Sequence, residues 1–129
     1  MATINTRLVV QSKNVFSNTL NQRVDKSFSV TSEILKRVKS ITATTTGTAE
    51  DILLVSEYGA DKDVFVFLRN RATAKAKYLY IKVGSQQIMK LAPGQYTIFP
   101  WRTETGDNLS VYGNDSNGIN LEYLVGKMA

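Results

Sequence analysis

The sequence predicts an all-β fold: a single antiparallel β-sandwich or jelly-roll-like domain with an extended N-terminal arm. Short runs rich in β-branched and aromatic residues recur along the chain, and glycine, proline and Asn/Asp turn signals separate them. No helical segments intervene between the runs, which favours a sandwich over any mixed α/β architecture. We expect the arm to cover residues 1–22 and the sandwich to cover residues 23–129.

The first half of the chain predicts its strands less sharply than the second half. Possible strands lie at residues 7–11, 27–30, 35–45 and 52–57, and the Asn-, Ser- and Gln-rich stretch at 12–22 predicts a long loop or arm. Residues 32–39 could form a short helix, because Ile34, Leu35 and Val38 share one helical face behind a cap at Ser32. The β-branched threonines that follow at 42–46 favour an extended chain instead.

The strand-and-turn pattern is clearest from Val64 onward. The run from Val64 to Leu68 is continuously apolar, which predicts a strand covered on both faces. Residues 76–83 alternate in polarity, so that their aliphatic side chains predict a core face and their tyrosines an outer face. Turns are expected at 84–85 and at 93–94, where proline presets one turn torsion and glycine accepts positive φ. The predicted connection of these strands is a meander.

Three further strands complete the predicted sandwich. Residues 95–99 end at Pro100, which cannot donate to a strand ladder and therefore belongs at a strand end or on an edge strand. Residues 108–112 and 119–125 predict two more strands, and the intervening loop at 113–118 is rich in glycine and Asn/Asp.

Composition lowers the expectation of an enzyme. The 129 residues suffice for one domain with a sizeable core, and they include no cysteine, which excludes disulfides, thiol nucleophiles and thiolate metal sites. They also include no histidine, the usual general base and the commonest ligand for transition metals. We therefore expect a non-enzymatic protein with no cofactor and no metal. Among the acidic residues between 50 and 63, the Asp-Lys-Asp run at 61–63 predicts a turn, because it lacks the further spaced oxygens that a calcium site needs.

No apolar run approaches the roughly 20 residues that a membrane helix needs. The N-terminal residues also lack the basic-then-apolar order of a secretory signal. The sequence therefore predicts a protein that is made and kept in a cytoplasm, or released from it by lysis.

Two groups of residues are candidates for contact with a partner. The first is the basic stretch at 69–90, which contains no acidic residue. With Tyr78 and Tyr80 as stacking platforms, this stretch would suit the binding of nucleic acid. The same stretch also fits a solvated strand face or a surface that docks on an acidic protein lattice. The second group surrounds Trp101, which is either a lid on the core or an interface anchor. The candidate interface residues are Trp101, Arg102, Pro100, Tyr78, Tyr80, Arg69 and Arg71, and the other basic residues of the stretch are Lys75, Lys77, Lys82 and Lys90.

Four segments resemble the pattern of small structural proteins of tailed phages. They are Val66 to Asn70, Tyr80 to Gly84, the Leu-Ala-Pro-Gly-Gln-Tyr run at 91–96, and the Leu-Glu-Tyr-Leu-Val run at 121–125. The resemblance covers the second half of the chain and transfers no functional residues. It implies a virion component, such as a head decoration or cement protein or a small tail or fibre part. Its implied partners are the major capsid protein or other virion proteins and further copies of the chain, with assembly in the host cytoplasm.

Two alternatives remain open at the level of sequence. The chain could bind nucleic acid, as a single-strand binder or as the coat protein of a small RNA virus. The coat-protein version fits less well, because the C-terminal third predicts strands where that fold needs a dimer-forming helix. The chain could also be a carbohydrate-binding module that uses Trp101 and nearby tyrosines as a sugar platform.

Overall fold

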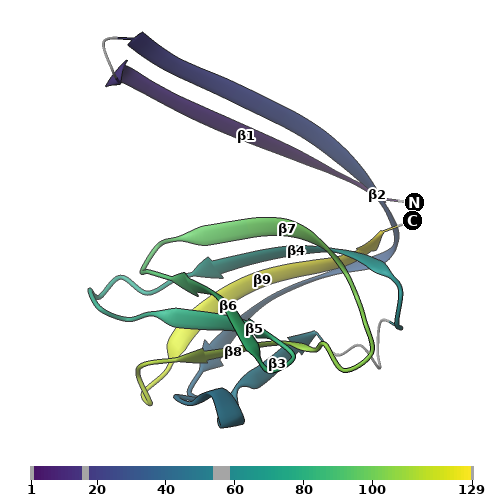
Figure 1. Cartoon of the computed structure of the whole chain (residues 1–129), viewed down its shortest axis with the longest axis vertical. Coiled ribbons are helices and arrows are strands. Elements are labelled where there is room, and N and C mark those ends of the chain that lie inside the picture. Colours follow the sequence, from purple (N-terminus) through teal and green to yellow (C-terminus); the bar gives the residue numbers. More distant parts are fainter. Residues whose placement is uncertain (1, 16–17, 54–58, 129) are drawn as a thin grey trace.

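The computed structural model of the chain describes residues 2–15, 18–53 and 59–128, which form two antiparallel sheets (Figure 1). Sheet A contains, in spatial order, β1 (Ala2–Val15), β2 (Asn18–Ile41), β9 (Ile119–Met128), β4 (Asp63–Asn70) and β7 (Tyr96–Arg102). Sheet B contains β3 (Glu50–Leu53), β8 (Leu109–Gly113), β5 (Leu79–Val83) and β6 (Gln86–Leu91). A single 3₁₀ turn, η1 (Thr46–Thr48), precedes β3. The predicted all-β sandwich is confirmed.

The strand pairing is that of a jelly roll. Strand β2 pairs with β9, β3 with β8, β4 with β7, and β5 with β6, and all four pairs are antiparallel. These pairs are nested along the chain, so the eight strands from β2 to β9 form one long hairpin with β5 and β6 at its tip. Rolling that hairpin places the pairs alternately in the two sheets, which is the topology of eight-stranded jelly rolls.

The core lies between the two sheets and follows from side-chain alternation along each strand. In β4, Val64, Val66 and Leu68 point into the core, as do Leu79 and Ile81 in β5. The continuously apolar run in β4 was predicted to be covered on both faces, and Phe65, on the opposite face of the strand, is only 3% exposed. The other residues buried in the core are Ile41, Ile52, Leu53, Leu91, Leu109, Val111, Ile119, Leu121, Tyr123 and Val125.

The predicted meander is wrong outside the β5–β6 hairpin. The turn at Gly84 does join two neighbouring strands, but β4 and β5 lie in different sheets, and so do β6 and β7. The turn at Pro93 and Gly94 forms as predicted, with φ of 80° at Gly94 and a hydrogen bond from the Gln95 amide to the Ala92 carbonyl. Turn chemistry reverses the chain, but it does not determine which sheet the next strand joins.

The N-terminal segments are more regular than the sequence predicts. Residues 32–39 lie in β2, so the strand is confirmed and the helix is wrong. The stretch at 12–22 is strand at 12–15 and 18–22, not loop. Strand β2 ends at Ile41, before the predicted 45, because the Glu50 carboxylate accepts the Thr42 and Ala43 amides. The strand expected at 52–57 is β3, which begins at Glu50, and residues 54–58 lie outside the described part of the chain.

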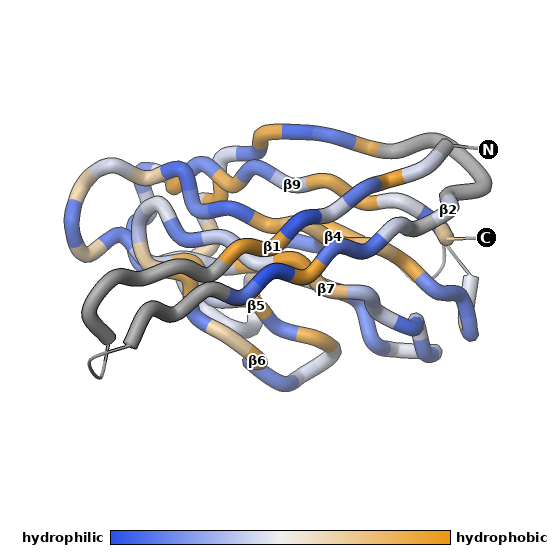
Figure 2. The backbone as a smooth tube through the Cα atoms, turned by 90° about the horizontal axis from the view of Figure 1, so that it is seen from above, coloured by the Kyte–Doolittle hydropathy of each residue, from blue (hydrophilic) through white to orange (hydrophobic). Residues whose placement is uncertain are grey.

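Strand β1 and residues 18–30 of β2 form a long hairpin, which we call the hairpin arm. Its register runs from Ala2 opposite Val30 to Val15 opposite Asn18. The register of β2 on β9 shifts between Val30 and Ile34, and there the strand bends. Beyond the bend the arm doubles back over sheet A and diverges from it toward the tip (Figure 1). Viewed from above, the arm runs across β4 and β7 (Figure 2).

Candidate protein-interaction surfaces

The hairpin arm has one polar face and one mainly apolar face. Side chains alternate along paired strands, and Leu8 lies opposite Val24 in the register. Ile4, Thr6 and Leu8 share a face of β1 because they are two positions apart along the strand. Val24 of β2 lies on the same face because it is directly opposite Leu8. Residues 5 and 7 of β1, and 23, 25 and 27 of β2, occupy the other face.

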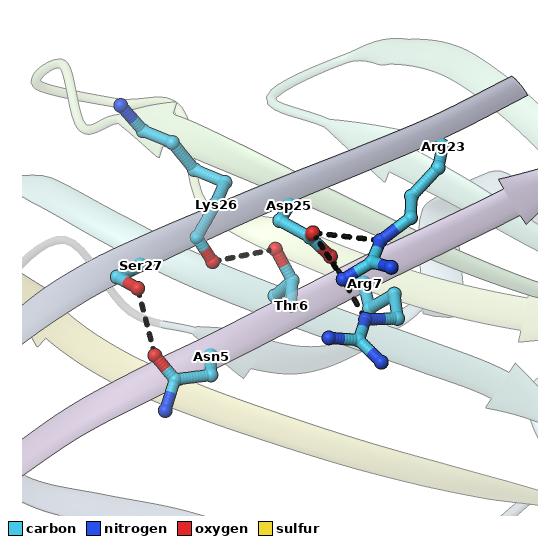
Figure 3. Close-up of polar contacts among 7 residues, drawn as sticks. All are labelled: Asn5, Thr6, Arg7, Arg23, Asp25, Lys26 and Ser27. Atoms are coloured by element: carbon cyan, nitrogen blue, oxygen red, sulfur yellow. Dashed lines mark hydrogen bonds and ion pairs between the residues drawn. The ribbon is translucent and has the colours of Figure 1, made fainter.

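An ion pair and a hydrogen bond link the two strands across the polar face, and a second ion pair lies within β2 (Figure 3). The Asp25 carboxylate accepts a hydrogen bond at 2.9 Å from Arg7 Nε and a second at 2.8 Å from Arg23 Nε, and Ser27 Oγ donates to Asn5 Oδ1 at 2.7 Å. The hydrogen bonds from Arg23 and then Arg7 hold the pKa of Asp25 below its ordinary value. All these side chains are exposed, so their main effect is to fix the register of the hairpin.

The apolar face of the arm is only partly covered. Ile4 and Thr6 are half-buried, whereas Leu8 is 52% exposed and Val24 is 50% exposed. Ile4 lies opposite Phe28, close to the bend that follows Val30, whereas Leu8 and Val24 lie opposite each other farther along the arm. The hairpin arm therefore presents apolar side chains that its own sandwich does not bury.

A cleft of about 370 Å³ separates the arm from the outer face of sheet A. Aromatic and aliphatic side chains from three strands form its floor, and β1 forms its roof. Charged side chains also contribute to the lining. The residues that line the cleft are Ile4, Asn5, Thr6, Arg7, Lys36, Phe65, Phe67, Ile98, Glu122, Tyr123 and Leu124.

The apolar floor continues onto the exposed edge strand β7. Ile98 and Tyr96 are both largely exposed, and they lie opposite Phe67 and Arg69 of β4. The rings of Phe67 and Tyr96 are in contact, with centroids 6.3 Å apart. An apolar strip thus leads from beneath the arm to the edge of sheet A.

The tyrosines predicted as stacking platforms lie on the outer face of sheet B. The Tyr80 ring stacks on Tyr112 at a centroid distance of 4.8 Å, and the Lys90 ammonium lies 4.1 Å from the Tyr78 ring centroid and 5.5 Å from that of Tyr80. Tyr112 also donates from its hydroxyl to Gln87 Oε1 at 2.6 Å. Tyr112 thus occupies one face of the Tyr80 ring, and Lys90 lies over one face of the Tyr78 ring.

The basic stretch at 69–90 does not form one surface. Arg69 lies on the outer face of sheet A, whereas Lys82 and Lys90 lie on the outer face of sheet B. Two other members are paired: Arg71 lies 3.7 Å from the Glu122 carboxylate, and Lys77 lies 2.9 Å from that of Asp115. Lys82 donates to the Thr46 carbonyl at 2.8 Å. The sandwich separates these charges, although the sequence places them close together.

The residues around Trp101 lie along β7. Trp101 is half-buried and packs against the core opposite Val64, which is the arrangement of a lid. Pro100 is exposed on an edge strand, as predicted, but the strand continues past it to Arg102. Arg102 is exposed and forms an ion pair with Asp63 at 3.2 Å. Of the candidate interface residues near Trp101, those exposed to a partner are Pro100 and Arg102.

The sequence predicts an N-terminal arm at residues 1–22, but it does not identify the hairpin form of the arm or the cleft beside it as a candidate site. A signal was present, because Ile4, Thr6 and Leu8 alternate with polar residues, as expected for a strand with one apolar face. Within the described residues, no group of three or more acidic side chains is placed to hold a metal ion. The same residues contain no helix with the length and apolar character that spanning a membrane requires.

Comparisons with known proteins add no family assignment. No protein-family model matches the chain, and no curated protein matches it significantly. The functional proposal therefore depends on the jelly roll and on the surfaces described above.

Proposed function

We propose that the chain is a non-enzymatic structural protein of a virus particle, a capsid decoration or cement protein that binds and stabilises the shell through protein contacts. The observation that carries the proposal is the hairpin arm, which extends from a packed jelly roll and leaves Leu8 and Val24 half-exposed. Exposed apolar surface on an ordered element is typical of a protein-interaction site. An assembly protein needs such an adhesive element on a stable scaffold.

The jelly roll and the charge of the chain are compatible with this proposal. Eight-stranded jelly rolls occur in viral capsid proteins, and they also occur in lectins and cupins, so the fold alone does not determine the function. The net charge of +5 favours association with an acidic protein lattice. The resemblance of the second half of the chain to tailed-phage structural proteins points in the same direction.

Nucleic-acid binding is the alternative, and the arrangement of the basic stretch supports it less well. One face of the Tyr78 ring is occupied by Lys90 and one face of the Tyr80 ring by Tyr112, and the basic Arg69 lies on the opposite side of the sandwich from Lys82 and Lys90. A filter-binding assay tests this alternative, because phosphate contacts weaken steeply as salt rises. Salt-dependent retention of single-stranded DNA or RNA would favour the alternative over the virion proposal.

Carbohydrate binding loses its main support in the structure. A sugar platform needs an exposed aromatic face, and Trp101 packs against the core instead. We expect tryptophan fluorescence to stay unchanged when sugars are added.

Virus particles provide the direct test of the proposal. Particles from lysates that produce the chain would be separated on a density gradient and analysed by mass spectrometry. We expect the chain to co-sediment with the major capsid protein at a comparable copy number. Recovery of the chain only in the soluble fractions, with intact particles that lack it, would refute the proposal.

A further inference from the structure

The packing of the hairpin arm on its own sandwich is incomplete. Protein interiors rarely contain voids much larger than a water molecule, yet a cleft of about 370 Å³ lies between the arm and sheet A. Leu8 and Val24 lie on the same side of the arm as the half-buried Ile4, yet both remain half-exposed. The arm and the sheet thus present two apolar surfaces that face each other without full contact.

The bend in β2 explains why the contact does not close within one chain. The hairpin arm joins the sandwich through residues 31–33 of β2, where the register on β9 shifts. Beyond this bend the arm diverges from the sheet, so residues nearer the tip lie farther from the floor (Figure 1). Full contact within one chain would need a sharper bend in a continuous strand. An arm supplied by another chain does not have this constraint.

The two surfaces match in chemistry as well as in position. The floor carries Phe67, Ile98 and Leu124, and the arm carries Ile4 and Leu8 on the facing side. The lining also includes the charged side chains of Arg7 and Glu122, of which Arg7 is paired with Asp25 and Glu122 with Arg71. The occupant that suits this floor is therefore an amphipathic hairpin of the same kind as the arm.

We propose that the hairpin arm docks on the outer face of sheet A of a second copy of the chain. Exchange of an identical element between copies is a low-cost route to a two-fold dimer. Each arm meets, on the other copy, the same floor that it faces in its own chain. In the exchanged dimer Leu8 and Val24 become buried, and the cleft is filled. The proposal deepens the proposed function by naming what the arm binds. Its test uses the purified chain alone, so it can fail while the virion assignment stands.

Site-directed cross-linking tests the exchange, because the chain has no cysteine of its own. Two full-length variants with tags of different size, Ile4→Cys in the arm and Ile98→Cys in the floor, would be co-expressed and treated with a short bismaleimide. We expect a covalent product that contains one chain of each tag. The matched control replaces Ile98→Cys with Ile88→Cys, since Ile88 is 47% exposed against 45% for Ile98 but lies in sheet B. A mixed product no more abundant than in this control would overturn the proposal.

Sedimentation supplies an independent measurement. We expect the purified chain to associate in a concentration-dependent manner. We also expect Leu8→Gln to weaken the association by about ten-fold or more, because a buried leucine is replaced by a polar side chain. Val9→Gln is the matched control, because Val9 is 45% exposed on the polar face of the same strand and should leave the association unchanged. A chain that stays monomeric at every concentration, or equal effects of the two substitutions, would overturn the proposal.

Discussion

Asn70 is a buried side chain whose removal should destabilise the sandwich markedly. It lies at the end of β4 and is fully buried. Its amide nitrogen donates to the carbonyls of Lys77 at 2.9 Å and Leu91 at 3.0 Å, and its oxygen accepts the Ala72 amide at 2.9 Å. One side chain thus joins the end of β4 to the following loop and to the end of β6 in the other sheet.

The magnitude follows from these three bonds. In Asn70→Ala the Leu91 carbonyl stays buried without this donor, which costs about 1–2 kcal/mol, and the two more accessible groups cost about 0.5–1 kcal/mol each. The free energy of unfolding should therefore fall by about 3 kcal/mol. For a domain of this size that corresponds to a decrease in Tm of about 10 °C.

Thermal and urea unfolding, followed by circular dichroism, would measure the effect. Asn120→Ala is the matched control, because Asn120 is exposed on β9, and its Tm should change little. Asn70→Asp keeps the shape of the side chain but removes both donated bonds and buries a charge, so it should cost more than Asn70→Ala at neutral pH. If Asn70→Ala unfolds at the wild-type temperature, the structural role assigned to this side chain is refuted.

Three further predictions follow from other polar and backbone features. Thr103→Val should lower the free energy of unfolding by about 1–2 kcal/mol in urea titrations, because the buried Thr103 Oγ1 donates to the Gly59 carbonyl at 2.6 Å, and Thr103→Ser should restore most of it. Gly118→Ala should cost about 1–3 kcal/mol, because φ is 102° and the added Cβ would collide with a serine side chain, whereas Gly47→Ala meets no atom within 4 Å and should cost far less. The lowered pKa of Asp25 means that its stabilisation of the hairpin arm is present above the ordinary aspartate pKa and is lost as pH falls through the lowered value. The protection factors of the arm amides, which compare the measured exchange rate with the intrinsic rate at each pH, should therefore fall in acid for the wild type but not for Asp25→Asn, and an arm with equal acid response in both would contradict the assignment.

The turns and strands of the second half could be predicted because their signals are local. Pro93 and Gly94 specify a turn through their own backbone preferences, and the alternation around Leu79 and Ile81 identifies a core face through the period of a strand. Trp101 illustrates the limit of such signals, because its sequence context suits an interface anchor as well as a lid. Packing against the core, which involves residues far away in sequence, decides for the lid.

The sequence by itself determined the all-β class and the turn positions, because each of these follows from torsion preferences or from polarity alternation over a few residues. It left Pro100 either at a strand end or on an edge strand, and the strand order decided for the edge strand. Only the tertiary structure decided which sheet each strand joins, because nested pairing depends on contacts between distant segments. The same long-range pairing carries Arg69 and Lys82 to opposite faces of the sandwich, although they are close in sequence. It also folds the hairpin arm over sheet A, and the cleft between them exists because the bend in β2 brings the two apolar surfaces together without closing them.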